Sequence, residues 1–361
     1  MNIQNLRNLS LRNFRSHKNL ELDLNSNFVF FSGPNGVGKT NILEAISLFS
    51  PGRGLRGANL NDLKSISSSV NWKLFSVFQV AEELLEVEIS VEDDGKKTIR
   101  VDGKKKPLIY LGNILKIIWL TPSMDRLWTG VASERRKFLD RIVMNFFPDH
   151  PRDCLFYEQA LRKRNQLFKE NQTDLAWFSA IEKQMAEIGY RIDVNRRKVI
   201  NILIESQKTL IERGFLPYLE VYLSSPEIIN IEKFQEDLFN GRTKDKVLCR
   251  TLIGPHRSDL VVRHRAKNIE ARYCSTGEQK ALLLTLFVAN AFAICRKFGA
   301  PPIILLDEIV AHLDQENFLN FFDQLKFINA QIFATGTEKS YFERLNLDFL
   351  SFDLKLTEEG I

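Results

Sequence analysis

The chain has 361 residues, of which 44% are apolar and 26% charged, and this composition excludes a disordered or low-complexity protein. Its four cysteines form no CxxC pair, which disfavours a disulfide scaffold and a zinc module and fits a reducing cytoplasm. The longest apolar stretch, residues 281–294, is shorter than the ~20 residues of a membrane span, so we expect no membrane partner. A formal net charge of +5 is by itself only a weak indication of a nucleic-acid partner.

The N-terminal segment predicts two strands, a buried strand, a glycine-rich loop and a helix, in that order. Residues 9–14 and 20–24 alternate apolar with polar positions around a basic turn, which is typical of a hairpin. Residues 28–31 are apolar throughout, as in a strand buried on both faces. Between residues 41 and 49 the apolar positions recur with helical spacing.

The next segments predict a small antiparallel sheet followed by helices. Residues 86–101 show a period of two around a turn at 93–95, and a second turn follows at 102–103. The helical spacing then returns at 131–146, at 153–169 and at 174–213, with Ser133 as a candidate cap of the first helix and Trp177 and Met185 as core residues of the third. That third helix would reach roughly 60 Å unless Gly189 breaks it.

A phosphate-binding loop follows the first buried strand and fits the pattern GxxxxGK[ST]. The glycines allow backbone N–H groups to converge on phosphate oxygens at the positively polarised start of a helix. We expect the lysine to neutralise the β and γ phosphates of ATP and the threonine hydroxyl to bind Mg²⁺. The predicted ATP-binding residues are Gly33, Pro34, Asn35, Gly36, Val37, Gly38, Lys39 and Thr40.

A second buried strand, residues 303–306, runs directly into two carboxylates. In nucleotide-hydrolysing sites, such a strand brings a carboxylate to the metal-bound phosphates. We therefore assign Asp307 to Mg²⁺ and Glu308 to polarising the attacking water, so that Lys39, Asp307 and Glu308 are the predicted catalytic residues. Residues 331–334 are a further buried-strand candidate, and Thr335 and Thr337 follow it, either near the γ phosphate or as structural residues.

The segment Cys274–Gln279 places a Ser-x-Gly run at the start of a long apolar helix. Ser275 and the exposed amides around Gly277 can form a second anion site. Since one nucleotide needs only one phosphate loop, a second site suggests ATP sandwiched between two copies of the chain. An ordinary capped core helix is the alternative for this short motif.

These motifs and their order resemble the ABC-type ATPase head of the SMC/Rad50 group, and several further segments resemble the RecF family. The segments are LSLRNFR at 9–15, TPSMD at 121–125, ERRKFLDR at 134–141, YEQALRKRNQL at 157–167, GPHRSDL at 254–260, STGEQ at 275–279 and LLDEIVAHLD at 305–314. ERRKFLDR and GPHRSDL distinguish RecF from Rad50 and from transporter ATPases. The helical insertion is too short for an SMC coiled coil.

The resemblance implies an α/β fold: an ABC-type ATPase head, with a mixed central sheet and an antiparallel β-subdomain, carrying an inserted helical arm. The expected domains are the N-terminal half of the head (1–127), the arm (128–225) and the C-terminal half of the head (226–361). The resemblance also implies that Asp314 joins Ser275 and Gly277 at the nucleotide of the opposite subunit. Four positions depart from the usual family pattern and leave the hydrolysis rate open: Ser258, Glu278, Glu308 and His312.

The resemblance further implies a cytoplasmic protein of DNA repair, recombination, replication and the SOS response to DNA damage. The implied DNA partner is double-stranded DNA, including its junctions with single strands or gaps. The implied protein partners are RecR, RecO and a second copy of the chain that associates in the presence of ATP. Basic clusters near the predicted arm are candidate phosphate contacts, although each alone is typical of a solvated face. The candidate DNA-binding residues are Arg135, Arg136, Lys137, Arg162, Arg164, Arg196 and Arg197.

Besides another SMC-like ATPase, two other interpretations remain at this stage. One is a nucleotide-gated DNA clamp with negligible turnover, in which His312 and the altered signature segment, residues 274–279, have removed catalysis. The other is the ATPase subunit of a transporter, which would carry a Leu-Ser-Gly-Gly-Gln signature that this chain lacks. His256 and Arg257 can reach a phosphate of nucleotide or DNA, or can stabilise their own loop.

Overall fold

Two compact units make up the chain, and the polypeptide crosses between them more than once. The computed structural model describes residues 4–65, 68–92, 95–212, 217–308, 315–337, 339–345 and 348–355. The first unit consists of Met1–Asp125, Leu210–Leu216 and Leu283–Ile361, and the second of Arg126–Thr209 and Pro217–Leu282. The predicted boundary at residue 226 does not coincide with this division, since 226–282 cluster with the helical segments.

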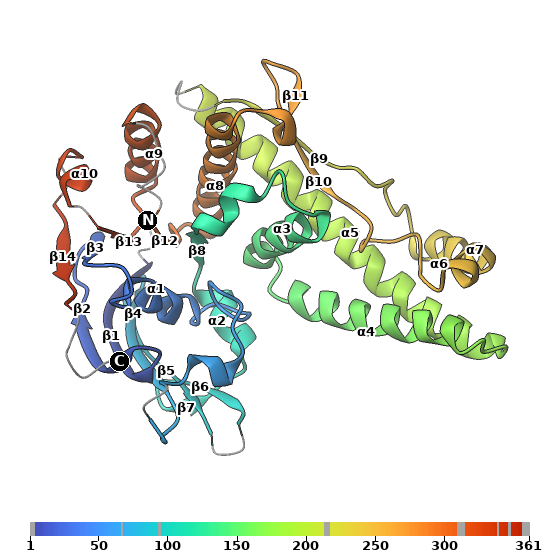
Figure 1. Ribbon diagram of the computed structural model, residues 1–361, viewed down its shortest axis with the longest axis horizontal. Coiled ribbons are helices and arrows are strands. Elements are labelled where there is room, and N and C mark those ends of the chain that lie inside the picture. The colour runs from blue at the N-terminus through green and yellow to red at the C-terminus, as the bar shows by residue number, and fades with distance from the viewer. Residues whose placement is uncertain are drawn as a thin grey trace. The chain divides into compact units, whose positions relative to one another are not determined.

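A five-stranded sheet lies at the centre of the first unit (Figure 1). Its strands are all parallel among the described pairs, in the order β14 (Leu350–Asp353), β3 (Phe28–Ser32), β13 (Ile332–Gly336), β12 (Ile303–Leu306), β8 (Ile117–Leu120). Strands β3, β12 and β8 are buried along their whole length, as predicted for β3 and β12 from their continuous apolar runs.

The two faces of β3 pack against different partners. Phe28 and Phe30 contact Phe342 of α10 (Ser340–Glu343), with ring centroids 5.3 and 4.4 Å apart. Val29 and Phe31 belong to the core cluster that includes the helix α1 (Lys39–Ser47). Helix α9 (Gln315–Ile328) adds Phe322 to the first face, 5.9 Å from Phe28. The phosphate loop therefore begins on a strand fixed by aromatic packing.

A six-stranded antiparallel sheet completes the first unit. Its order is β2 (His17–Asp23), β1 (Gln4–Phe14), β4 (Lys73–Val80), β5 (Glu83–Val91), β6 (Lys97–Val101), β7 (Lys104–Lys105). The predicted pairing of 86–101 is confirmed, because Val87 lies opposite Val101 and Ile89 opposite Ile99. The short helix α2 (Leu108–Ile114) follows β7, and one-turn 3₁₀ helices lie at Leu60–Leu63 and Pro122–Arg126.

Helices dominate the second unit. They are α3 (Ala132–Phe146), α4 (His150–Lys169), α5 (Leu175–Ile211), α6 (Ile231–Asn240) and α7 (Arg242–Leu248). A three-stranded sheet in the order β11 (Ile269–Glu270), β10 (Leu260–His264), β9 (Leu219–Leu223) and a 3₁₀ turn at Ala271–Tyr273 accompany them. These elements confirm the predicted helical insertion.

Two details of the predicted helices differ in the structure, and the possible break at Gly189 does not occur. The residue that caps α3 is Val131, so Ser133 lies inside the helix. Helix α5 continues through Gly189, where a Cβ would lie 2.7 Å from Phe234 and 3.0 Å from Tyr157, so glycine there permits close packing. Met185 is buried as expected, but Trp177 is 60% exposed, and its prediction as a core residue was wrong.

Helix α8 (Thr276–Phe298) is longer than the apolar stretch that the sequence suggested. The helix has 23 residues, and the mean hydropathy over an 18-residue stretch of it is 1.6, so it is long and apolar enough to cross a membrane. However, 67% of that stretch is buried inside the fold, which is typical of a core helix.

Candidate functional site

The phosphate loop joins the end of β3 to the start of α1, as its motif predicts. Gly33, Gly36 and Gly38 adopt φ values of 141°, 86° and 99°, which favour glycine. Two of them also lie against other chain segments, since a Cβ at Gly33 would be 2.4 Å from the Leu354 carbonyl oxygen and one at Gly38 2.5 Å from Ser16 Oγ. Pro34, Asn35 and Gly36 are exposed, whereas Val37 is buried beneath the loop.

Lys39 is buried at the first position of α1, and its amine points back into the loop. Its Nζ donates to the carbonyl oxygens of Gly33, at 2.6 Å, and Pro34, at 3.0 Å. The positive charge is thereby kept beside the backbone amides at a helix N-terminus, where the helix dipole also favours an anion. This geometry suits the binding of the terminal phosphates of a nucleotide.

Asp307 joins the phosphate-loop helix to the neighbouring strands. Its Oδ1 accepts hydrogen bonds from Thr40 Oγ1, at 2.7 Å, and from Thr335 Oγ1, at 2.9 Å. The backbone N–H of Glu308 in turn donates to Thr335 Oγ1, at 3.0 Å. Because β3, β13 and β12 are adjacent and parallel, their carboxyl ends bring these groups together. Thr335 therefore lies in the site, whereas Thr337 is exposed.

The oxygen atoms of Thr40 and Asp307 fit a magnesium ion. Mg²⁺ prefers hard oxygen ligands and usually takes one or two from the protein, with phosphates and water completing its shell. A hydroxyl and a carboxylate 2.7 Å apart, beside the phosphate loop, provide such a pair. Glu308 is half-buried with φ of 48°, an uncommon conformation for a residue other than glycine that is frequent at functional sites.

The turn between β1 and β2 supports the phosphate loop, a role that the sequence did not reveal. His17 Nε2 lies 3.2 Å from the Gly38 carbonyl oxygen, and burial lowers the pKa of His17 despite that contact. Arg15 donates from Nε and Nη2 to the buried carboxylate of Glu44 on α1, at 2.9 and 2.8 Å. The basic residues of this turn could be seen in the sequence, but their position against α1 depends on the sheet.

The predicted signature segment forms a capping box at the start of α8. The backbone N–H and the hydroxyl of Ser275 donate to Glu278 Oε2 at 2.8 and 2.9 Å, and Ser275 Oγ accepts from the Glu278 N–H at 3.4 Å. Hydrogen bonds lower the pKa of Glu278 to about 2, and the bond from Lys267 has a larger effect than those from Ser275. Gly277 has open space where a Cβ would point. Asp314 and His312 lie outside the described residues.

The structure gives most of the candidate DNA-binding arginines internal partners. Arg164 is fully buried, and Arg196 donates from Nε and Nη2 to Asp140 at 2.7 and 2.8 Å. These two arginines were wrongly predicted to face DNA, because a buried guanidinium paired with a carboxylate is not available to a phosphate.

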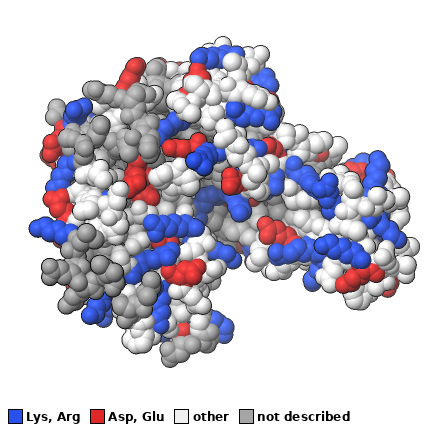
Figure 2. Space-filling model, in the orientation of Figure 1, with Lys and Arg blue, Asp and Glu red and all other residues white. Residues whose placement is uncertain are grey.

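The other five candidates differ in their surroundings. Arg135 pairs with Asp259, Arg136 donates to the Ser258 carbonyl and Arg197 pairs with Asp193. Lys137 and Arg162 are exposed. On the face shown in Figure 2, basic side chains are interspersed with acidic ones rather than gathered into one patch.

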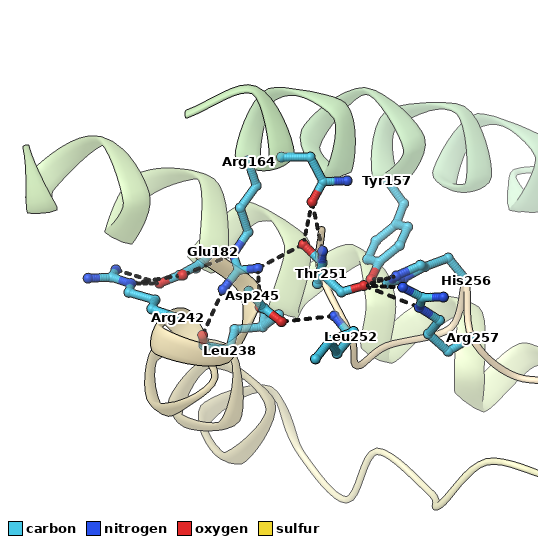
Figure 3. Close-up of polar contacts among 11 residues, drawn as sticks. Tyr157, Arg164, Glu182, Leu238, Arg242, Asp245, Thr251, Leu252, His256 and Arg257 are labelled. Carbon is cyan, nitrogen blue, oxygen red and sulfur yellow. Dashed lines mark hydrogen bonds and ion pairs between the residues drawn. The ribbon is translucent and has the colours of Figure 1, made fainter. Parts of the chain in front are cut away.

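The segment Gly254–Leu260 packs against α4, which favours a stabilising role for His256 (Figure 3). His256 Nδ1 lies 3.1 Å from the Tyr157 hydroxyl and its Nε2 lies 3.1 Å from the Thr251 carbonyl oxygen. Arg257 donates to the same carbonyl oxygen from Nη2, at 2.9 Å. Burial is the main cause that lowers the pKa of His256 from 6.5 to about 4, and the charge of Arg257 acts in the same direction.

This lowered pKa predicts a loss of stability in mild acid. The unfolded chain takes up the His256 proton near pH 6.5 and the folded chain only near pH 4, so stability is complete above 6.5 and falls as the pH drops towards 4. Between pH 7 and pH 5 we expect a loss of about 2 kcal/mol from this group. Urea unfolding at both pH values should show a smaller loss in His256→Gln, and an equal loss would exclude His256 as its source.

Comparison with known proteins places these features in a family. The family model described as "RecF/RecN/SMC N terminal domain" matches residues 5–348. The DNA replication and repair protein RecF of Mesorhizobium japonicum is 40% identical over 96% of this chain and 95% of that protein. The protein of the same name from Rhizobium meliloti is 38% identical over 94% of each chain.

Solved structures show the same architecture. One described as "the recombination mediator protein RecF-ATPrS in RecFOR pathway" superposes with a TM-score of 0.85 at 24% identity, over 97% of this chain and 96% of that one. The corresponding RecF-ATP structure gives 0.82 at 25% identity, over 99% of each chain. An Smc head domain of Pyrococcus furiosus gives 0.54 at 18% identity, over 98% of this chain and 94% of that one, which shows a related fold. The predicted ATPase-head fold is confirmed, and the chain belongs to the RecF family.

Proposed function

We propose that this RecF-family chain is an ATP-dependent DNA-binding protein of DNA replication and recombinational repair. Its curated relatives are named for DNA replication and repair, and a structural relative is described as a recombination mediator with ATP in the RecFOR pathway. The resemblance extends the proposal to duplex DNA with single-strand junctions, RecR and RecO as partners, and a cytoplasmic role in the SOS response. The transporter interpretation has no support from these relatives.

The observation that carries the proposal is the convergence of Lys39, Thr40, Asp307 and Thr335 at one edge of a parallel sheet. We assign Lys39 and the loop amides to the phosphates of ATP, and Thr40 and Asp307 to Mg²⁺, which supplies charge neutralisation when bound. Thr335 orients Asp307 through its hydroxyl and accepts the Glu308 N–H. Glu308 then polarises the water that attacks the terminal phosphate in a slow hydrolysis reaction.

ATP also joins two copies of the chain in this proposal. In this proposal Ser275 and the N-terminal amides of α8 form a second anion site when a phosphate of the partner's ATP replaces the Glu278 carboxylate, which caps the helix in the single chain. The surface at Gly277 is uncovered. Two copies related by a twofold axis would each contribute a phosphate loop to one site and a signature helix to the other. Hydrolysis would separate the copies and release DNA, whose phosphates are contacted by exposed cations such as Lys137, Arg162 and Lys198.

Gly277→Leu tests this dimer without disturbing the monomer. Leucine has the higher helix propensity, and a Cβ at this exposed position would meet no atom within 4 Å, so the free energy of unfolding should stay equal or rise by up to about 1 kcal/mol. In the dimer its side chain would occupy the space of the partner's nucleotide. Small-angle scattering with saturating Mg·ATP should show dimers for the wild type and monomers for Gly277→Leu and for Lys39→Met. A Gly277→Leu dimer as tight as wild type would exclude the signature helix from the interface.

A further inference from the structure

Asp140, His150 and Cys154 bring three metal-ligating atoms together inside the second unit. Asp140 lies on α3, whereas His150 and Cys154 lie about one turn apart on α4 and therefore share one side of that helix. A carboxylate oxygen, an imidazole nitrogen and a sulfur atom of these residues all lie within 4.8 Å of one another. His150 is fully buried and the other two are partly exposed, which places the cluster just below the surface.

One nitrogen of His150 lies close to two partners at once. Its Nε2 is 2.9 Å from Asp140 Oδ1 and 3.5 Å from Cys154 Sγ. A single N–H group makes only one well-aligned hydrogen bond, whereas a metal ion between the three atoms would contact all of them. The bond lengths of a tetrahedral zinc site place sulfur and nitrogen ligands roughly 3.5 Å apart, as observed, and nitrogen and oxygen ligands about 3.4 Å apart. Binding the ion would therefore require Asp140 and His150 to separate by about 0.5 Å.

The pairing of Asp140 with Arg196 is compatible with a metal ion. Arg196 donates from Nε to Oδ1 and from Nη2 to Oδ2, at 2.7 and 2.8 Å. Since a carboxylate oxygen has two lone pairs, the ion would take the position on Oδ1 that His150 contacts. Arg196 also donates to the Pro255 carbonyl oxygen and to Ser258 Oγ, so its position does not depend on Asp140 alone. Hydrogen bonds to a ligating carboxylate are typical of metal sites, because they orient the ligand.

We propose that Asp140, His150 and Cys154 bind a zinc ion, with water as the fourth ligand. Zinc accepts a thiolate, an imidazole and a carboxylate, and the two negative charges balance the charge of the ion. Cys154 would release its proton to solvent on binding. The ion would join α3 to α4 and stabilise the second unit. The sequence disfavoured a zinc module because it contains no CxxC pair, but here one ligand comes from a second helix, which sequence spacing does not reveal.

Cobalt substitution tests the proposal on the full-length chain. Co²⁺ occupies tetrahedral zinc sites, and its bond to a thiolate absorbs in the near ultraviolet, a band that the oxygen ligands of the proposed Mg²⁺ site cannot produce. After treatment with EDTA, the wild type should show this absorption with Co²⁺ and lose it when Zn²⁺ is added. Cys154→Ser should lack the absorption and bind zinc more than about 100-fold more weakly. Cys249→Ser is the matched control, because Cys249 is also partly buried but belongs to no such cluster among the described residues.

Urea unfolding provides a second measurement. Zinc should raise the unfolding midpoint of the wild type and of Cys249→Ser, but not that of Cys154→Ser, because a ligand that binds the folded chain stabilises it. Cobalt absorption that persists in Cys154→Ser would assign the metal to another cysteine and overturn the proposal. A wild-type chain that shows no cobalt absorption and retains no zinc after dialysis would also overturn it, whether or not the variants fold.

Discussion

Replacing Glu308 by glutamine is expected to lower ATP hydrolysis by roughly 10²–10⁴-fold while ATP still binds. The substitution keeps the size of the side chain and the backbone hydrogen bond from residue 308 to Thr335, but removes the carboxylate that we propose to polarise the attacking water. Since Asp307, Thr40 and Lys39 remain in place, ATP-dependent dimers should persist and outlast those of the wild type. Phosphate release with and without duplex DNA measures the rate, and scattering measures the dimer.

Glu343→Gln is the matched control, because Glu343 is exposed on α10 and belongs to no part of the site. Its hydrolysis rate should equal that of the wild type. The experiment also distinguishes a slow ATPase from a nucleotide-gated DNA clamp without significant turnover, two functions between which the sequence did not decide. If Glu308→Gln and the wild type release phosphate at the same low rate, Glu308 has no catalytic role, and the chain is a nucleotide-gated DNA clamp without significant turnover.

Arg164→Met is expected to destabilise the chain by about 3–5 kcal/mol. The fully buried guanidinium of Arg164 donates to Glu182 on α5, at 3.0 Å, and to Asp245 on α7, at 2.6 Å. It also donates to Thr251 Oγ1, at 2.7 Å, and to the Leu238 carbonyl oxygen, at 2.8 Å, so one side chain joins five segments of the second unit (Figure 3). Methionine fills the volume but leaves two buried carboxylates with fewer donors.

Arg162→Met provides the control for this prediction. Arg162 lies two residues away on the same helix and is exposed, so its loss should change the free energy of unfolding by no more than about 0.5 kcal/mol. Urea unfolding of both full-length variants, followed by the circular dichroism of the helices, gives the comparison. Equal stabilities of the two variants would show that the buried network does not stabilise the second unit.

The parts of the site that the sequence predicted are those encoded in contiguous residues. The phosphate loop and the strand before Asp307 have local patterns, and adjacent parallel strands bring their ends together. Strand β4 was not predicted, because the sequence LFSVF carries apolar residues on both faces and obscures the period of two. The support that Arg15 and His17 give to α1 and to the loop spans different strands and helices, so no spacing in the sequence encodes it.

The basic clusters show how a local sequence pattern can lead to a wrong prediction. Arg162, Lys163 and Arg164 are consecutive, yet the first two are exposed and the third is fully buried, because successive residues of a helix point about 100° apart. A run of charged residues in the sequence does not show which side chains are exposed, because exposure depends on the face of the helix on which each residue lies. Trp177 was misassigned for a related reason, since helical spacing alone does not show where a helix extends beyond its partners.

Subunit complementation tests the central claim most directly, namely that each ATP site is built from two copies of the chain. Lys39→Met removes the phosphate loop from function and Ser275→Arg removes the signature helix, so each variant alone should be inactive. In a mixed dimer, the intact loop of one copy faces the intact signature of the other, and an equal mixture should recover roughly a quarter of wild-type hydrolysis. A mixture as inactive as its components would contradict the account, because it would place both motifs in a site within one chain.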